Sequence, residues 1–204
     1  MQEREQIEKL NAFATASGRT FDSEVTEYPK SGINTFQKYR AWAYVQEKER
    51  GGSVFACFSD PYARFGQSTI YSGAFVPLPA DIQSELLLRK KDVIDNINPF
   101  SKTRANALGN RIFDSRVVIS GKMGPAEKQL LSSSMLQRQI IDSLSDAPNL
   151  LVYINSIHPG FVPWFDDMAC LGIVYPRGWQ LEEAFVERLL FRAEKIRECL
   201  PTDH

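Results

Sequence analysis

Residues 181–200, close to the C-terminus, carry apolar side chains at spacings of three and four. Because an α-helix has 3.6 residues per turn, this spacing places them along one face and leaves the charged residues on the remaining surface. Such a helix is stabilised mainly by packing its apolar face against another layer, so we predict a C-terminal amphipathic helix buried against a sheet. The apolar face consists of Leu181, Phe185, Leu189, Ala193, Ile196 and Leu200.

The first half of the chain is predicted to be one helix followed by strands. Ile7, Leu10 and Phe13 share a helical face, and Gly18 is suited to the position just after the helix. A turn-rich stretch around Pro29 follows. Runs rich in aromatic and β-branched residues then indicate a hairpin and two further strands. These runs cover 39–46, 54–58, 69–78 and 86–88.

The second half is predicted to have the order β, α, α, β, β, α. Residues 98–110 lack apolar periodicity and indicate a surface connection. A strand-like run through Phe113, Val117 and Ile119 follows, and Pro125 is suited to the first turn of a helix. The capping-box spacing from Ser134 to Gln137 predicts a second helix. Two strands at 150–154 and 169–175 precede the C-terminal helix.

These elements predict an α+β fold. Short loops join most of the strands, which favours a mostly antiparallel sheet with the helices packed on one face. We expect a single α+β domain over 1–204, with two recognisable halves at 1–100 and 111–204.

Several short strings resemble a broad group of uncharacterised bacterial proteins, in which a soluble α+β domain follows one or two N-terminal membrane helices. The resemblance implies the same fold and attachment near a membrane, but no chemistry. This sequence differs in having no membrane helix, and it begins on a helix with charged residues at its head. The strings are Phe13-Ala14 with Gly18 and Phe21, 75–79, Phe113-Asp114 with 117–119, 127–131, 132–136 and Ile140-Ile141.

Composition excludes several classes of protein. The formal net charge is -1, which gives no overall attraction to nucleic acid or to an anionic membrane. The three cysteines have no C-x-x-C spacing, so neither a disulfide framework nor a zinc cluster is indicated and a reducing compartment is expected. No apolar run approaches the ~18 residues needed to cross a bilayer, and the charged first residues do not resemble a signal peptide, so we expect neither a membrane span nor secretion. We expect a cytoplasmic protein, with peripheral membrane association as an alternative.

The common catalytic and nucleotide-binding motifs are absent. Residues 121–124 resemble an anion-binding turn before a helix, but glycines that end a strand explain them better. Cys57, Cys170 and Cys199 lie in apolar strands or on the last helix, where a cysteine usually acts as a small buried hydrophobe. No cofactor or metal is indicated.

One loop gathers side chains that could do chemistry. Residues 158–167 combine the only histidine away from the C-terminus, His158, with aromatic residues, prolines and a carboxylate pair. An imidazole beside carboxylates is suited to acid/base work or to weak binding of a divalent metal. A structural loop held by its aromatic residues is the favoured interpretation. The candidate ligand residues are His158, Trp164, Asp166 and Asp167.

The stretch 89–116 has seven basic residues against three acidic ones. A local excess of this kind attracts anionic lipid or nucleic acid, although a solvated connection is the default interpretation. Its two aromatic residues are too few for the stacking surface of a single-strand binder, so nucleic acid is disfavoured. The candidate basic patch is Arg89, Lys90, Lys91, Lys102 and Arg104.

These observations leave three functional hypotheses, with a non-catalytic role favoured. The leading one is a domain that binds a partner protein or acts at a membrane surface, with only weak, salt-sensitive binding to anionic surfaces. The second is a small-molecule or metal-dependent enzyme centred on the loop from His158 to Asp167. The third is a nucleic-acid-binding module that uses the basic stretch from Arg89 to Arg116.

Overall fold

The computed structural model describes residues 2–29, 38–47, 52–64, 67–92, 95 and 106–201. The strands are β1 (Thr20–Glu27), β2 (Tyr39–Gln46), β3 (Val54–Arg64), β4 (Gln67–Pro77), β5 (Leu86–Lys90), β6 (Val117–Gly121), β7 (Leu151–Ile154) and β8 (Cys170–Tyr175). The helices are α1 (Gln2–Ala16), α3 (Arg111–Arg116), α4 (Pro125–Leu131), α5 (Ser134–Asp146) and α6 (Glu183–Arg197).

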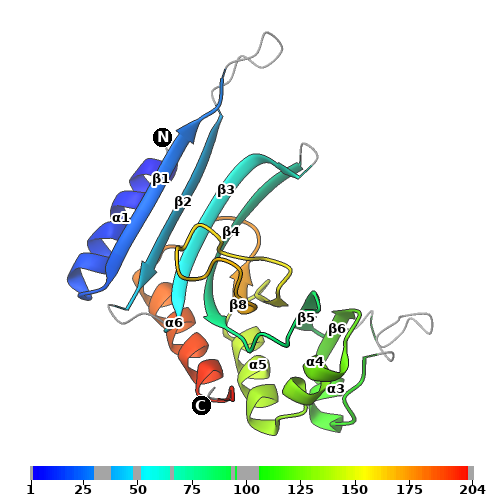
Figure 1. Ribbon diagram of the computed structural model, residues 1–204. Helices are drawn as coiled ribbons and strands as arrows, with labels where there is room; N and C mark the ends of the chain where they lie inside the picture. The colour runs from blue at the N-terminus through cyan, green and yellow to red at the C-terminus, as the bar shows by residue number, and fades with distance from the viewer. Residues whose placement is uncertain are drawn as a thin grey trace.

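All eight strands belong to one sheet, in the order β1-β2-β3-β4-β8-β7-β5-β6 (Figure 1). Every neighbouring pair is antiparallel. Strands β8 and β7 from the second half lie between β4 and β5 from the first half, so the two halves share the sheet. The predicted α+β fold with an antiparallel sheet and a C-terminal helix is confirmed.

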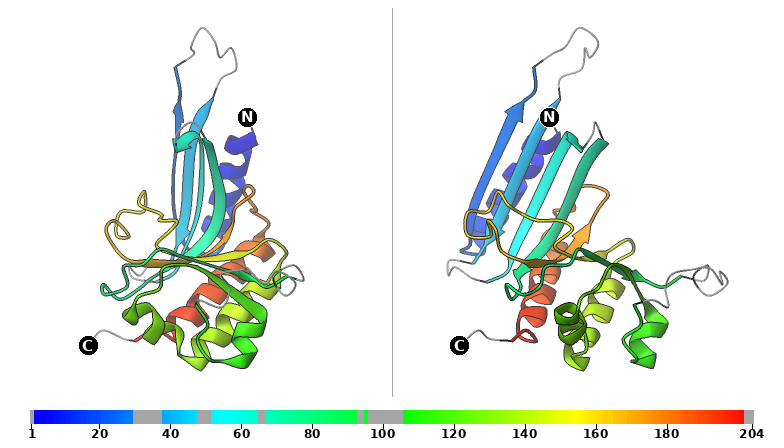
Figure 2. Two further views of the ribbon diagram at one scale, coloured as in Figure 1. Left: turned by 90° about the vertical axis from the view of Figure 1, so that its right-hand side faces the viewer. Right: turned by 45° about the vertical axis from the view of Figure 1, so that its right-hand side comes forward.

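The two faces of the sheet are covered differently. Figure 2 shows α1 and α6 on one side of the sheet and the loop 155–169 on the other. Strand alternation explains the division: Ala41, Ala43 and Val45 of β2 join the core under the helices. Tyr44 of the same strand belongs to a second buried cluster under the loop. We refer to these as the helix face and the loop face.

Helix α6 is the central element of the helix face. Leu189 and Ile196 are fully buried there, as predicted, whereas Phe185 is only half-buried. Val186 and Leu190 are buried instead of Phe185 at this level, so the buried stripe lies slightly to one side of the predicted one. Val186 and Leu190 keep the spacing of four residues, which is why the helix itself was predictable.

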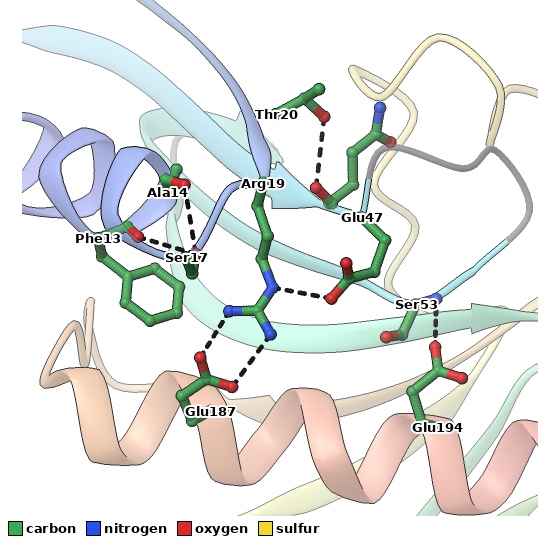
Figure 3. A network of polar contacts seen from close by, with 10 residues as sticks. Phe13, Ala14, Ser17, Arg19, Thr20, Glu47, Ser53, Glu187 and Glu194 are labelled. Atoms are coloured by element: carbon green, nitrogen blue, oxygen red, sulfur yellow. Dashed lines mark hydrogen bonds and ion pairs between the residues drawn. The ribbon is translucent and has the colours of Figure 1, made fainter.

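Carboxylates on α6 also attach the helix to the ends of the first strands (Figure 3). The guanidinium of Arg19, between α1 and β1, donates two hydrogen bonds to Glu187, at 2.6 and 3.1 Å. Its Nε donates to Glu47, after β2, at 2.9 Å. Further along α6, Glu194 accepts a hydrogen bond from the backbone N–H of Ser53 at 2.8 Å. The arginine therefore joins α1, the β1–β2 hairpin and α6 at one corner.

Two elements were not predicted. Strand β1 was missed because its sequence is mostly polar, and only Phe21 and Val25 pack against the core. It is an edge strand that pairs only with β2, so half of its surface stays in water. Helix α3 replaces the first part of the strand predicted through Phe113. Asn110 caps it by accepting hydrogen bonds from the backbone N–H groups of Ile112 and Phe113.

The predicted second-half helices are present, with one shift at a cap. Pro125 occupies the first turn of α4, as expected. The N-cap of α5 is Ser133 and not Ser134, because the Ser133 hydroxyl accepts the hydrogen bond from the N–H of Leu136. The side chain of Gln137 donates to the carbonyl of Leu131 instead of closing a capping box.

The carboxylate of Glu127 accepts hydrogen bonds from backbone N–H groups around the turn before α4. It is 3% exposed and accepts hydrogen bonds from the backbone N–H groups of Gln83, Ser84 and Gly124, at 3.0, 2.9 and 2.9 Å. This side chain therefore occupies the turn at 121–124 that resembled an anion site. Burial raises the pKa of the Glu127 carboxyl, but the hydrogen bonds from Ser84 and Gln83 outweigh it and leave the pKa below its ordinary 4.5.

The position of Leu189 leads to a stability prediction for α6. Replacing this buried side chain by alanine should lower the free energy of unfolding by about 2–5 kcal/mol, through lost burial and a cavity. Phe191 on the same helix is 55% exposed, so Phe191→Ala should cost less than about 1 kcal/mol. Chemical denaturation of both variants measures the difference. Equal midpoints for the two variants would contradict the placement of α6 in the core.

The hydrogen bonds of Glu127 lead to a pH-dependent prediction. Glu127→Gln should cost about 1–3 kcal/mol near neutral pH, because three backbone donors lose their charged acceptor. The folded-state pKa is lowered, so the carboxylate contributes stability above pH 4.5 that is lost as the pH falls through the folded-state value. The free energies of unfolding of the wild type and the variant should thus converge as the pH falls below 4.5. The exposed Glu183→Gln is the control, and a gap that stays constant in acid would contradict this account.

Candidate ligand-binding groove

The loop 155–169 is fastened to the sheet at its start. The amide of Asn155 donates to the carbonyls of Ile82 and Ser84 at 3.0 and 3.3 Å, and its oxygen accepts from the N–H of Cys170 at 2.8 Å. Asn155 has a positive φ of 56°, which asparagine tolerates better than most residues. One side chain thus closes both ends of the loop against the segment that precedes β5.

Apolar side chains hold the middle of the loop on the sheet. Val162 and Phe165 are completely buried in the cluster of the loop face, which also contains Phe75. Phe161 stacks between Trp42 and Phe58, with ring centroids 5.3 and 5.9 Å apart. The loop is therefore packed like a core element along most of its length, and it can form one wall of a binding site.

A groove of about 690 Å³ lies between this loop and strands β2, β3, β4 and β7. Most of the apolar side chains that line it are aromatic, and its size is in the range of small-molecule pockets. Phe58 and Tyr71 stack at 5.7 Å on the sheet side. The lining residues are Arg40, Phe58, Thr69, Tyr71, Tyr153, 155–158, Gly160 and Phe161.

Arg40 is the charged side chain of the groove. Its guanidinium carbon is 5.6 Å from the centroid of the Phe58 ring, and its side chain is 49% exposed. Within the described ranges its nearest carboxylate oxygen is on Asp60, 4.0 Å from Nε, which is too long for a hydrogen bond. Asp60 is itself held by the Tyr28 hydroxyl and by the N–H of Tyr62, at 3.0 and 2.7 Å. The guanidinium therefore keeps donors for a ligand.

A second cavity of about 640 Å³ adjoins the first and has the opposite charge. The two cavities share Asn155 and His158, which form the wall between them. The second is lined by the carboxylates of Glu85, Asp166 and Asp167, together with apolar side chains from 78–82 and 168–169. Together they form a site with a cation at one end and three anions at the other.

The structure places the predicted loop residues in different positions. His158 lies on the shared wall, and its Nε2 is 2.7 Å from the carbonyl oxygen of Met168. Asp166 and Asp167 are exposed and meet His158 only at the second cavity. Trp164 lines neither cavity, because its indole donates to the side chain of Gln46 and packs on Phe165. Trp164 thus holds the loop against β2.

Residues from the strands complete the groove, and the sequence did not single them out. Arg40, Phe58, Tyr71 and Tyr153 come from four strands and meet only through the register of the sheet. Burial raises the pKa of both Tyr71 and Tyr153, so their hydroxyls stay neutral at physiological pH. Strand alternation is the only local signal for them, and it does not distinguish a groove from a core.

The basic stretch is divided by the fold. Arg89 makes a two-pronged pair with Asp95, at 2.6 and 2.5 Å, and this pair holds the pKa of the Asp95 carboxyl well below its usual range. Lys90 and Lys91 line a separate cavity. Lys102 and Arg104 lie outside the described residues. Arg89 therefore does not act as a free cation beside the two lysines.

Among the described residues, no cluster of three or more histidine, cysteine, aspartate or glutamate side chains is arranged to hold a metal ion. The part of the chain that the structure describes also contains no helix long and apolar enough to cross a membrane. No known protein-family model matches the chain, and no curated protein or solved structure is significantly similar to it. The resemblance to membrane-anchored bacterial α+β domains stays a prediction.

The two buried thiols lead to a prediction about reactivity. Cys57 and Cys170 are fully buried, and burial raises the pKa of Cys57 well above its usual value and that of Cys170 to about 12. Both should react with a water-soluble thiol reagent on the order of a hundredfold more slowly than the half-buried Cys199, because labelling requires local opening. A Cys199→Ser variant isolates the two slow thiols. Rapid labelling of either in the native protein would contradict the packing described.

Proposed function

We propose that this protein is a non-catalytic binding domain, and that its groove receives a short segment of a partner protein. The observation that carries the proposal is the pair of adjoining cavities, the first lined by aromatic side chains and Arg40, the second by three carboxylates. An extended peptide with an acidic residue at one end and a basic residue at the other matches that polarity. A compact ligand would fill only one of the two cavities.

The chemistry of the first cavity favours an apolar or aromatic side chain beside a carboxylate. Phe58, Tyr71 and Tyr153 present ring surface, and aromatic pairs contribute about 0.5–1.5 kcal/mol beyond their buried area. The guanidinium of Arg40 is suited to a carboxylate, because its planar donors match two oxygens. Its position over Phe58 would bring the ring and the charge of the ligand close together.

The geometry of His158 supports binding over catalysis. One ring nitrogen is already within hydrogen-bond distance of the Met168 carbonyl, and no carboxylate in the described ranges is hydrogen-bonded to the imidazole. A general base normally needs a partner that orients it and a free nitrogen aimed at the substrate. We therefore assign His158 to the wall between the two cavities.

We further infer that the domain works in a reducing compartment such as the cytoplasm. Its three cysteines are all free thiols, two of them buried in separate clusters on opposite faces of the sheet. Disulfides predominate in oxidising compartments, and thiols stay reduced in the cytosol.

A randomised array of short capped peptides tests the groove. We expect the bound peptides to share the order acidic, aromatic, basic. Arg40→Gln should remove the preference for an acidic residue at the first position. It should also lower the affinity for the selected peptide about tenfold, or 1.4 kcal/mol. Asp166→Asn with Asp167→Asn should remove the preference for the basic position only.

The matched control is Arg138→Gln, an exposed arginine on α5. It should bind the selected peptides as the wild type does. The proposal is wrong if the bound peptides lack the charge order, or if Arg40→Gln selects the same peptides with the same affinity.

A further inference from the structure

A third cavity lies away from the groove, on the helix face near the β5–β6 edge of the sheet. Figure 1 shows β5, β6, α3 and α5 gathered at this end of the molecule. The cavity has a volume of about 290 Å³ and lies between the end of β5, the junction of α3 with β6, and the last turn of α5. Its lining residues are Lys90, Lys91, Ser115, Arg116, Val117, Ile141, Leu144 and Ser145.

The fold brings three cations together around this cavity. Lys90 lies opposite Val117 in the pairing of β5 with β6, and Arg116 directly precedes Val117. The backbone N–H of Lys91 donates to the Arg116 carbonyl at 2.7 Å, which fixes the two chains against each other. None of the described residues that line the cavity is acidic.

Lys90 and Arg116 are exposed and Lys91 is half-buried, and among the described residues none of the three is paired as the partly buried Arg89 and Arg192 are. Within the described ranges, Lys90 and Arg116 have no carboxylate partner, and the Lys91 ammonium contacts only the carbonyl oxygen of Asp114, at 3.4 Å. By contrast, Arg89 on the loop face is paired with Asp95, and Arg192 on α6 is paired with Asp146. Like charges left close together repel each other, so an anion bound among them relieves a cost.

The end of α3 explains only part of this arrangement. A cation near a helix C-terminus is favourable, and the contact of Lys91 with the Asp114 carbonyl has this role. A helix of six residues leaves little negative potential for two further cations. The hydroxyls of Ser115 and Ser145 already donate to carbonyls of their own helices, both at 2.8 Å. The donors available to a ligand are therefore cationic.

We propose that this cavity binds a phosphate group. A phosphate ester carries up to two negative charges and three acceptor oxygens, which match two lysines and one arginine better than a single carboxylate does. The apolar floor of Val117, Ile141 and Leu144 leaves room for a small substituent on the phosphate. The site is separate from the peptide groove, because the two have no lining residue in common.

Binding of inorganic pyrophosphate at constant ionic strength tests the proposal on the whole chain. We expect a saturable titration in which the backbone amide signals of Lys91, Arg116 and Val117 shift in the NMR spectrum. Arg116→Gln should lower the association constant about tenfold, and Lys91→Gln with Arg116→Gln should remove saturable binding. The control is Arg138→Gln, which should stay within about twofold of the wild type because Arg138 does not line the cavity.

Vesicles identify the source of the phosphate. Co-sedimentation with vesicles containing phosphatidic acid, lost in the double variant, assigns the site to a lipid headgroup. Pyrophosphate binding without vesicle binding assigns it to a soluble phosphate ester, and both results support the proposal. It is overturned if pyrophosphate does not saturate, or if the double variant, shown to be folded by its spectrum, binds as the wild type does.

Discussion

The packing of the loop face depends on the contact between Phe75 and Gly172. The two residues are opposite each other on β4 and β8, and a Cβ at Gly172 would lie 2.5 Å from the Phe75 ring. Only glycine lets the ring lie against the neighbouring strand, because real Cβ atoms do not approach so closely. The ring is then part of the second buried cluster, which also contains Val162 and Phe165 of the loop 155–169.

The groove follows from that cluster. Once Val162 and Phe165 are buried, the loop must leave the sheet on either side of them, and it does so at His158 and near Asp167. The carbonyl of Met168 and the side chain of Asn155 stabilise these two ends. The cavities therefore lie beside the buried side chains of Val162 and Phe165. Their walls are positioned by a packed core and not by a free loop. A preorganised wall of this kind lowers the entropy cost of binding.

How much of this could be predicted depends on the range of the interactions. The stripe that includes Leu189 and the turn before Pro125 are local patterns, so the C-terminal helix and the start of α4 were found from the sequence. Helix α3 depends on one cap at Asn110, and β1 depends on pairing with β2, so neither has a strong local signal. The groove residues Arg40 and Tyr71 meet only through strand register, which no sequence window contains. The composition of the loop at His158 marked it as a candidate site, but the sequence did not show which strands would form the other wall.

The distribution of charge separates structural roles from binding roles. The formal net charge is only -1, but the ionised side chains fall into two groups. In the first, Arg19, Arg192 and Glu127 each have close hydrogen-bonded partners that join separate elements of the fold. In the second, cations or anions line cavities without such partners in the described ranges, as at Arg116 and at Asp166. Both side chains are exposed, so water screens their charge in the free protein, and their donors and acceptors stay available to a ligand of opposite charge that enters the cavity.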